Sequence, residues 1–380
     1  MTSPTHGFAR LIGAACVVFG LSVVAATPAQ GATRSEEWPL DSAHFRADDV
    51  WQHSQGNSIT VAVLDTGVDA RHPDLAGQVI AGTGFVGITG DTGQTDLSGD
   101  SHGTSIAGII SGTGKADNGS GMMGLAPGSR IMPVRVSLNG TAEPVALAKG
   151  IIYAADQQAN VINISIGTTT PDPIIRSAVN YALGKGSIIV AAAGNSGDQG
   201  NPPTYPASFP GVVSVTAVDT SGRFWPRSES GPQTTLAAPG VDIFSANDHG
   251  GYLYGDGTSY AAPYVAATAA LIWSQHRQLT AGQVIAQLIA TANHKGDQPH
   301  DNEYGYGLIN PLRALTTPPT QQTRSNPLLT APPPAGPTSS GLEWLVPTIV
   351  GSIAVLVAIT TLTIRRRRRA HATSKKRPAR

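Results

Sequence analysis

Four polar residues of the sequence have the types that nucleophilic catalysis needs. A serine such as Ser259 becomes a nucleophile when a neutral histidine accepts its proton, and His102 can be that base. A carboxylate such as Asp65 fixes the tautomer of the histidine and stabilises its charged form. The side-chain amide of Asn195 and the backbone N–H of Ser259 can both donate to an oxyanion. The four residues therefore predict nucleophilic catalysis by Ser259.

Each of these residues lies at the end of a predicted element. Asp65 and Asn195 each end an apolar strand, and His102 and Ser259 each open an apolar helix. Taken alone, each has an ordinary explanation as a turn residue or a helix cap. In a parallel α/β sheet, however, the functional crevice lies beyond the carboxyl ends of the strands. We therefore expect the four side chains to lie together at one edge of one sheet.

The body of the chain alternates short apolar strands with helical patterns. We expect strands at 60–64, 131–136, 161–166, 188–193 and 212–217, and helices at 144–158 and 173–183. Strands that are apolar throughout and alternate with helices indicate an α/β fold, a doubly wound and mainly parallel sheet with helices on both faces. The helix that Ser259 opens consists mostly of small residues, which predicts its burial, and Pro263 is expected in its first turn.

Seven short segments of the chain resemble landmarks of the subtilisin-like serine proteases, the peptidase S8 family. They are 63–69, 101–108, 163–167, 191–197, 205–207, 238–240 and 257–263. The chain also keeps the family's order of Asp, His, Asn and Ser, and the resemblance covers about 51–315. It implies a serine endopeptidase that works through an acyl-enzyme. Asp65, His102 and Ser259 would form the catalytic triad, and Asn195 and Ser259 the oxyanion hole.

The resemblance also implies where a substrate binds. An extended polypeptide would add as a strand beside two segments, which comprise Val136, Ser137 and Leu138, and Ser165, Ile166 and Gly167. Such contacts are mainly to the backbone, so they predict neither the natural substrate nor the side chain preferred before the cleaved bond. Members of the family often bind structural calcium, but no calcium-loop pattern is evident and no ligands are assigned. No cofactor is expected.

Two other features of the sequence could be mistaken for catalytic ones. Residues 99–103 match the G-x-S-x-G nucleophile elbow of lipases, but that elbow requires a buried strand before it, and 91–98 is a polar loop. His72 is a rival base in a turn-like segment, which the family resemblance makes structural. Asn163 and Asn310 are expected to be core or cap residues.

The two ends of the chain predict export and membrane anchoring. The expected parts are a signal peptide at 1–32, a short extension at 33–50, the peptidase domain at 51–315, a Pro-rich spacer at 316–342, a transmembrane helix at 343–364 and a basic tail at 365–380. An uncleaved N-terminal anchor is the alternative to the signal peptide. The single cysteine, Cys16, lies in the leader, so the mature chain has no disulfide.

The distribution of charge predicts how the chain is oriented in the membrane and which kinds of partner it binds. Residues 34–343 hold 15 basic and 25 acidic groups, a net charge of −10, which argues against nucleic acid as a partner. The basic tail is expected in the cytoplasm and the domain outside the bacterial cell membrane. This layout resembles the mycosins, membrane-anchored proteases of type VII secretion, although some mycosins carry disulfides. A membrane secretion complex is thus a candidate partner, and the alternative function is a scaffold that stabilises such a complex.

Overall fold

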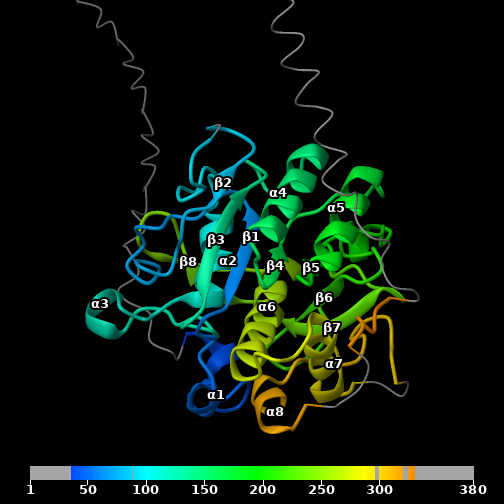
Figure 1. Cartoon of the computed structure of the whole chain (residues 1–380). Coiled ribbons are helices and arrows are strands. Elements are labelled where there is room, and N and C mark those ends of the chain that lie inside the picture. Colours follow the sequence, from blue (N-terminus) through cyan, green and yellow to red (C-terminus); the bar gives the residue numbers. More distant parts are fainter. Residues whose placement is uncertain (1–35, 89, 296–298, 320–323, 330–380) are drawn as a thin grey trace, which may run out of the picture.

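The computed structural model describes most of the chain between the two predicted membrane-related ends (Figure 1). The described residues are 36–88, 90–295, 299–319 and 324–329. The predicted signal peptide, the transmembrane helix and the basic tail lie outside them. Among the described residues, no helix has the length and hydropathy that a membrane crossing requires.

A seven-stranded sheet forms the centre of the fold. Its order is β2-β3-β1-β4-β5-β6-β7, and every neighbouring pair is parallel. The strands are β1 (Thr60–Asp65), β2 (Thr83–Gly84), β3 (Arg130–Arg135), β4 (Val161–Ile164), β5 (Ile188–Ala192), β6 (Val213–Val218) and β7 (Thr234–Pro239). A separate antiparallel hairpin joins β8 (Ile243–Ala246) to β9 (Tyr252–Gly255). The five strands predicted from the sequence are confirmed within a few residues at each end.

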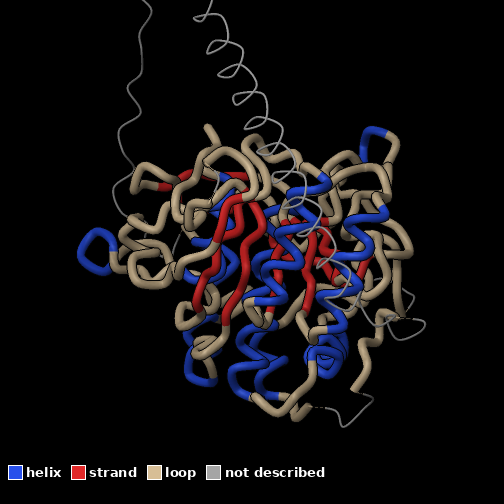
Figure 2. The backbone as a smooth tube through the Cα atoms, turned by 45° about the horizontal axis from the view of Figure 1, so that its top comes forward, coloured by secondary structure: helices blue, strands red, loops and turns tan. Residues whose placement is uncertain are grey.

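Helices cover both faces of this sheet, as the sequence predicted (Figures 1 and 2). They are α1 (Ala47–His53), α2 (His102–Ser111), α3 (Ala116–Gly119), α4 (Pro144–Asp156), α5 (Pro173–Gly184), α6 (Thr258–Gln275), α7 (Ala281–Thr291) and α8 (Pro311–Thr316), with short 3₁₀ turns at Trp38–Leu40 and Gly197–Gln199. Alternate strand residues enter different cores, because successive side chains of a strand point to opposite faces. Val61 and Val63 pack with α2 and α6, whereas Ala62 and Leu64 pack with α4 and α5.

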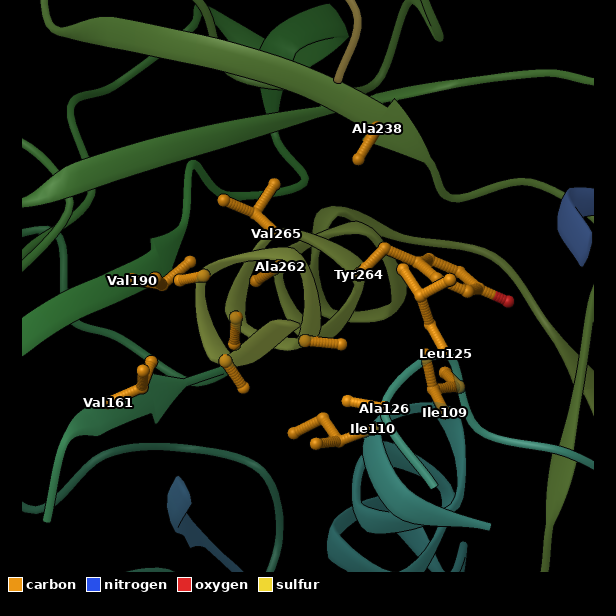
Figure 3. Close-up of a cluster of buried hydrophobic side chains, with 14 of the residues drawn as sticks. Ile109, Ile110, Leu125, Ala126, Val161, Val190, Ala238, Ala262, Tyr264 and Val265 are labelled. Carbon is orange, nitrogen blue, oxygen red and sulfur yellow. The ribbon is translucent and has the colours of Figure 1, made fainter. Parts of the chain in front are cut away.

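Helix α6 is the buried axis of the larger core. Every residue from Thr258 to Trp273 is buried. Figure 3 shows the helix between Val161 and Val190 of the sheet on one side and Ile109 and Ile110 of α2 on the other. Its many alanines allow this close approach from several directions, since a small side chain leaves little volume between packed elements. Packing along its whole length therefore fixes the position of the helix that carries Ser259.

Pro263 departs from the expectation that it lies in the first turn of α6. The helix begins at Thr258, so Pro263 lies inside it. A proline has no N–H for the carbonyl four residues earlier, which here is that of Ser259. The hydroxyl of Ser165 donates to this carbonyl instead, at 2.9 Å, and Asn163 Nδ2 donates to Ser165 Oγ at 2.9 Å. The break in the helix thus ties the Ser259 backbone to the end of β4.

The segment before the predicted peptidase domain is part of the fold. Leu40, Phe45 and Val50 are buried in the larger core, and the Phe45 ring lies 5.6 Å from that of Tyr264 in α6. The expected boundary between residues 50 and 51 falls inside α1. The extension therefore adds apolar contacts to the helix that carries Ser259.

The described part of the Pro-rich spacer also packs on the domain. Asn326 Nδ2 donates to the carbonyl of Gly211 at 2.8 Å, and the Gly211 N–H donates to the carbonyl of Leu328 at 3.2 Å. Thr280 Oγ1 donates to the carbonyl of Arg324 at 2.8 Å. The sequence predicted a solvated spacer from residue 316, and its polar composition gives no sign of these contacts.

Candidate active site

The four candidate residues come from four elements that meet at the carboxyl edge of the sheet. Asp65 is the last residue of β1, and His102 is the first residue of α2. Asn195 follows the end of β5, and Ser259 is the second residue of α6. β1 lies inside the sheet order and α6 packs against β1, β4 and β5, so these ends are neighbours in space. The predicted gathering at one edge is what the fold produces.

Asp65 and His102 form a buried hydrogen-bonded pair. His102 Nδ1 lies 2.8 Å from Asp65 Oδ1, and the Asp65 carboxylate is completely buried. The same oxygen accepts the backbone N–H of Thr66 at 2.8 Å, which fixes the carboxylate. An ionised carboxylate can only accept a hydrogen bond, so Nδ1 of His102 carries the proton that it donates to Asp65. Nε2 is then the basic nitrogen of a neutral His102. This is the tautomer that a general base needs.

The surroundings of His102 favour its charged form. Burial by itself lowers the pKa of His102, but the charge of Asp65 and its hydrogen bond raise it, with smaller contributions from Asp100 and Asp96. The net effect raises the pKa from 6.5 to about 9. A base of this strength takes a hydroxyl proton readily and is stabilised once charged.

Asp96 organises the start of α2 and was not predicted from the sequence. Its carboxylate accepts from the hydroxyls of Thr66 and Thr104, both at 2.8 Å, and from the Thr104 N–H at 2.9 Å. Ser98 adds two more donors to the same group, and its hydroxyl accepts the His102 N–H at 3.2 Å. Burial raises the pKa of Asp96 although the hydrogen bonds from Thr104 and Ser98 oppose the shift. The network thereby holds His102 in place beside Asp65.

Asn195 is oriented by the residue that precedes the candidate nucleophile. Its Oδ1 accepts both the N–H and the hydroxyl of Thr258 at 2.9 Å, so Nδ2 is the donor that stays available. Gly257 marks the space in front of it. A Cβ there would lie 3.0 Å from Ser259 Oγ and 3.2 Å from Asn195 Nδ2. The hydroxyl and the amide therefore face a common space, as an oxyanion hole requires.

Among the described residues, no hydrogen bond joins Ser259 to His102, although the residue after Ser259 contacts this histidine. The ring of the next residue, Tyr260, lies 6.0 Å from the His102 ring in an edge-to-face arrangement. Ser259 is 6% exposed, and its carbonyl is held by Ser165 as described above. Catalytic hydrogen bonds in free enzymes are often loose and tighten when substrate binds. The link from Ser259 to His102 thus stays a prediction.

The two predicted substrate-binding segments lie on either side of Asp65. Residues 136–138 follow β3 and residues 165–167 follow β4, and these two strands flank β1. Of the first segment, only Leu138 is strongly exposed. The hydroxyls of Ser137 and Ser165 donate within the protein, to the carbonyls of Thr141 and Ser259. These two hydroxyls are therefore occupied within the protein, and the binding of a substrate to the backbone of the two segments stays a prediction.

The two decoys have structural roles. His72 is completely buried, its Nδ1 accepts the Asp74 N–H at 3.1 Å and its Nε2 lies 3.0 Å from the Gly251 carbonyl. Ser101 is the left-handed residue before α2, and its hydroxyl donates to Asp248 at 2.6 Å. No strand lies between residues 91 and 101, so the lipase-type elbow is absent from this described segment. Neither residue can act as the predicted base or nucleophile.

Calcium ligands cannot be assigned from the structure. Within the described ranges, no three His, Cys, Asp or Glu side chains come together to hold a metal ion. Asp74, a buried carboxylate, is instead surrounded by donors of the protein, the N–H groups of Ala116 and Met122 and the hydroxyl of Tyr252. Its charge is thereby satisfied by the polypeptide itself.

Comparisons with known proteins show to which family the chain is similar. The profile of the Subtilase family (Peptidase_S8) matches residues 56–307. A thermophilic serine proteinase of Bacillus sp. (strain AK1) is 40% identical over 273 residues, 71% of this chain and 65% of the proteinase, just under two thirds of its length. Thermitase of Thermoactinomyces vulgaris is 40% identical over 250 residues, which cover 66% of this chain and 86% of thermitase.

A solved structure resembles the chain over a similar range. It is the crystal structure of MycP1 from the ESX-1 type VII secretion system, with a TM-score of 0.69 and 28% identity. The similarity covers 80% of this chain and 92% of MycP1.

Proposed function

The chain belongs to the subtilase family of serine proteases, and from this premise we propose that it is a membrane-anchored serine endopeptidase acting outside the cell membrane. The observation that carries the proposal is the buried His102–Asp65 pair at 2.8 Å, formed at the sheet edge where Ser259 and Asn195 also lie.

Each of the four residues has its own role in the proposed reaction. His102 Nε2 removes the proton of Ser259 Oγ while the oxygen attacks the carbonyl carbon of an extended peptide. Asn195 Nδ2 and the Ser259 N–H donate to the negative oxygen that forms; the latter lies in the first turn of α6, where N–H groups have no intrahelical partner. His102 then gives its proton to the departing amine. Water, activated in the same way, releases the acyl group from Ser259.

Replacing Asn195 by alanine should lower kcat by roughly 10² to 10³-fold, because one oxyanion donor is lost. This range was measured in a subtilisin, so it is carried over from a relative. KM should change little, since the donor acts mainly in the transition state. Steady-state kinetics on a peptide substrate checks the result.

The matched control for that substitution is Asn310→Ala. Asn310 Oδ1 caps α8 by accepting the Arg313 N–H at 2.9 Å, far along the chain from the proposed site. Its loss should reduce stability by about 1 kcal/mol and leave kcat unchanged. Equal activity of the Asn195→Ala variant and the wild type would remove Asn195 from the mechanism.

The membrane anchor and the link to secretion rest on the sequence and on the relatives. The uncharged stretch at 344–364, within the expected transmembrane helix, is long enough to cross a bilayer, and the basic residues at 365–369 favour a cytoplasmic tail. MycP1, whose structure resembles 80% of this chain, comes from a type VII secretion system. We therefore place the protease beside such a system, where its substrate would be an extended segment of an exported protein or of the system itself.

A chain that ends at residue 342 should separate from the membrane. The full-length protein should sediment with membranes and be cut by protease added to cells without their wall, because the domain lies outside. The truncated protein should appear in the medium. A cytoplasmic reporter fused after residue 380 should be protected. Recovery of both proteins in the cytoplasm would contradict the proposed topology.

A further inference from the structure

Glu229 is a buried carboxylic acid that lies directly behind the turn carrying Asn195. Glu229 is 2% exposed and lies in a polar segment for which no site residue was predicted. The Glu229 N–H donates to the carbonyl of Gly194 at 2.9 Å, and its Oε1 accepts the N–H of Ser196 at 3.3 Å. Glu229 therefore holds the residues on both sides of Asn195.

The contact with Gly194 is close enough to exclude any side chain there. A Cβ on Gly194 would lie 2.3 Å from the Glu229 carboxyl carbon, and the φ of Gly194 is 114°, a value that favours glycine. The glycine permits the approach of the carboxyl group but also leaves the backbone before Asn195 with little stiffness of its own. A fixed group packed against it supplies that stiffness.

The buried carboxyl group of Glu229 has too few hydrogen bonds to offset the cost of its burial. Burial raises its pKa, and hydrogen bonds from the Thr204 side chain and the Ser196 N–H only partly oppose the shift. Its Oε2 has no hydrogen-bond partner within the described part of the chain. A buried polar atom without a partner costs stability, and an apolar side chain of similar size would avoid that cost. Such a group calls for a role other than stabilising the fold.

We propose that Glu229 is a positioning residue for the oxyanion amide of Asn195. Thr258 holds Asn195 from the front by donating twice to Oδ1, and Glu229 holds the turn 194–196 from behind. With both in place, Nδ2 points steadily at the space shared with Ser259 Oγ. Glu229 touches neither the substrate nor the reacting atoms, so it acts only through Asn195. The inference rests on the proposed function and adds to it the group that fixes its oxyanion donor.

The test is a double-mutant cycle between Glu229 and Asn195. Glu229→Met fills the space but removes the acceptor of the Ser196 N–H, and it should lower kcat about ten-fold, within the range of couplings between neighbouring groups, with KM nearly unchanged. Its melting temperature should stay close to that of the wild type, because the unpartnered Oε2 and the acceptor of the Ser196 N–H are lost together, with opposite effects on stability. Glu229→Gln keeps an acceptor and should retain most of the activity.

The decisive arm is the same substitution in the Asn195→Ala background. Glu229→Met should change kcat there by less than about two-fold, because the group that it positions is gone. A ten-fold loss in both backgrounds, no loss in either, or a Glu229→Met protein that fails to fold would each overturn the proposal. The control is Asp74→Asn, which replaces another buried carboxylate by an amide. This substitution should lower stability and leave kcat unchanged.

Failure of this inference is distinguishable from failure of the proposed function. If the wild-type chain shows no hydrolysis that depends on Ser259, the proposed function itself is wrong. If wild-type hydrolysis depends on Ser259 and Asn195 but the Glu229 arms fail as described, only the positioning role is lost.

Discussion

Replacing Ser259 by alanine should lower kcat on the order of 10⁶-fold and leave the fold intact, which is the loss found for the corresponding single substitution in a subtilisin. The substitution removes only the hydroxyl group, whose oxygen is the proposed nucleophile. The backbone of residue 259 keeps its place, because Ser165 binds its carbonyl and not its side chain. Binding of peptide should therefore persist while turnover stops.

The control for this substitution lies on the same helix. Ser274 Oγ donates to the carbonyl of Asn57 near the far end of α6, so Ser274→Ala removes the same atom from the same element. It should leave kcat unchanged. Peptide hydrolysis assays, with circular dichroism to verify the fold, compare the two variants. Substantial turnover by the Ser259→Ala protein would show that another residue is the nucleophile.

Replacing Asp65 by asparagine should lower kcat by about 10⁴-fold at neutral pH. The amide keeps the shape of the carboxylate, but it cannot stabilise the charged imidazole, and it favours a tautomer in which Nε2 carries the proton. The variant should also lose the elevated pKa of His102, since the Asp65 charge and hydrogen bond are what raise it against burial. Nuclear magnetic resonance titration of the His102 ring measures this pKa in both proteins.

The pH dependence of the wild type follows from the same pair. His102 must be neutral to accept the Ser259 proton, so kcat/KM should rise with pH until it levels near the pKa of about 9. Stability should change in the opposite direction. A raised folded-state pKa means that the pair stabilises the fold fully below pH 6.5 and that this contribution is lost as pH rises through about 9. A rate that is constant from pH 6 to 9, with chemistry rate-limiting, would contradict His102 as the base.

The sequence was sufficient for the parts of the site that depend on strand and helix ends. Asp65 and Asn195 follow apolar runs whose parallel arrangement could be predicted, and parallel strands bring their carboxyl ends to one edge. The direct contact of Asp65 with His102 then follows from β1 and α2 being neighbours. Such features are encoded in short, continuously apolar segments that end at, or begin with, a polar residue.

The supporting residues could not be predicted, because their partners are distant in the sequence. Glu229 is one of several acidic residues in polar segments, and only the fold places it against Gly194. Asp96 likewise looks like a loop residue until Thr66 and Thr104 surround it. Pro263 was assigned to a first turn by a general preference, whereas the carbonyl that it frees is taken by Ser165. In each case a tertiary contact overrides the local pattern.

Covalent labelling tests the central claim most directly. A sulfonyl fluoride reacts with a serine that is activated by a neighbouring base, and the mass of the modified peptide identifies the residue. The account predicts a single adduct on Ser259, formed in proportion to loss of hydrolysis, absent from the Ser259→Ala protein and strongly reduced in His102→Ala. Inactivation of the wild-type chain by an adduct on another residue, with Ser259 unmodified, would contradict it.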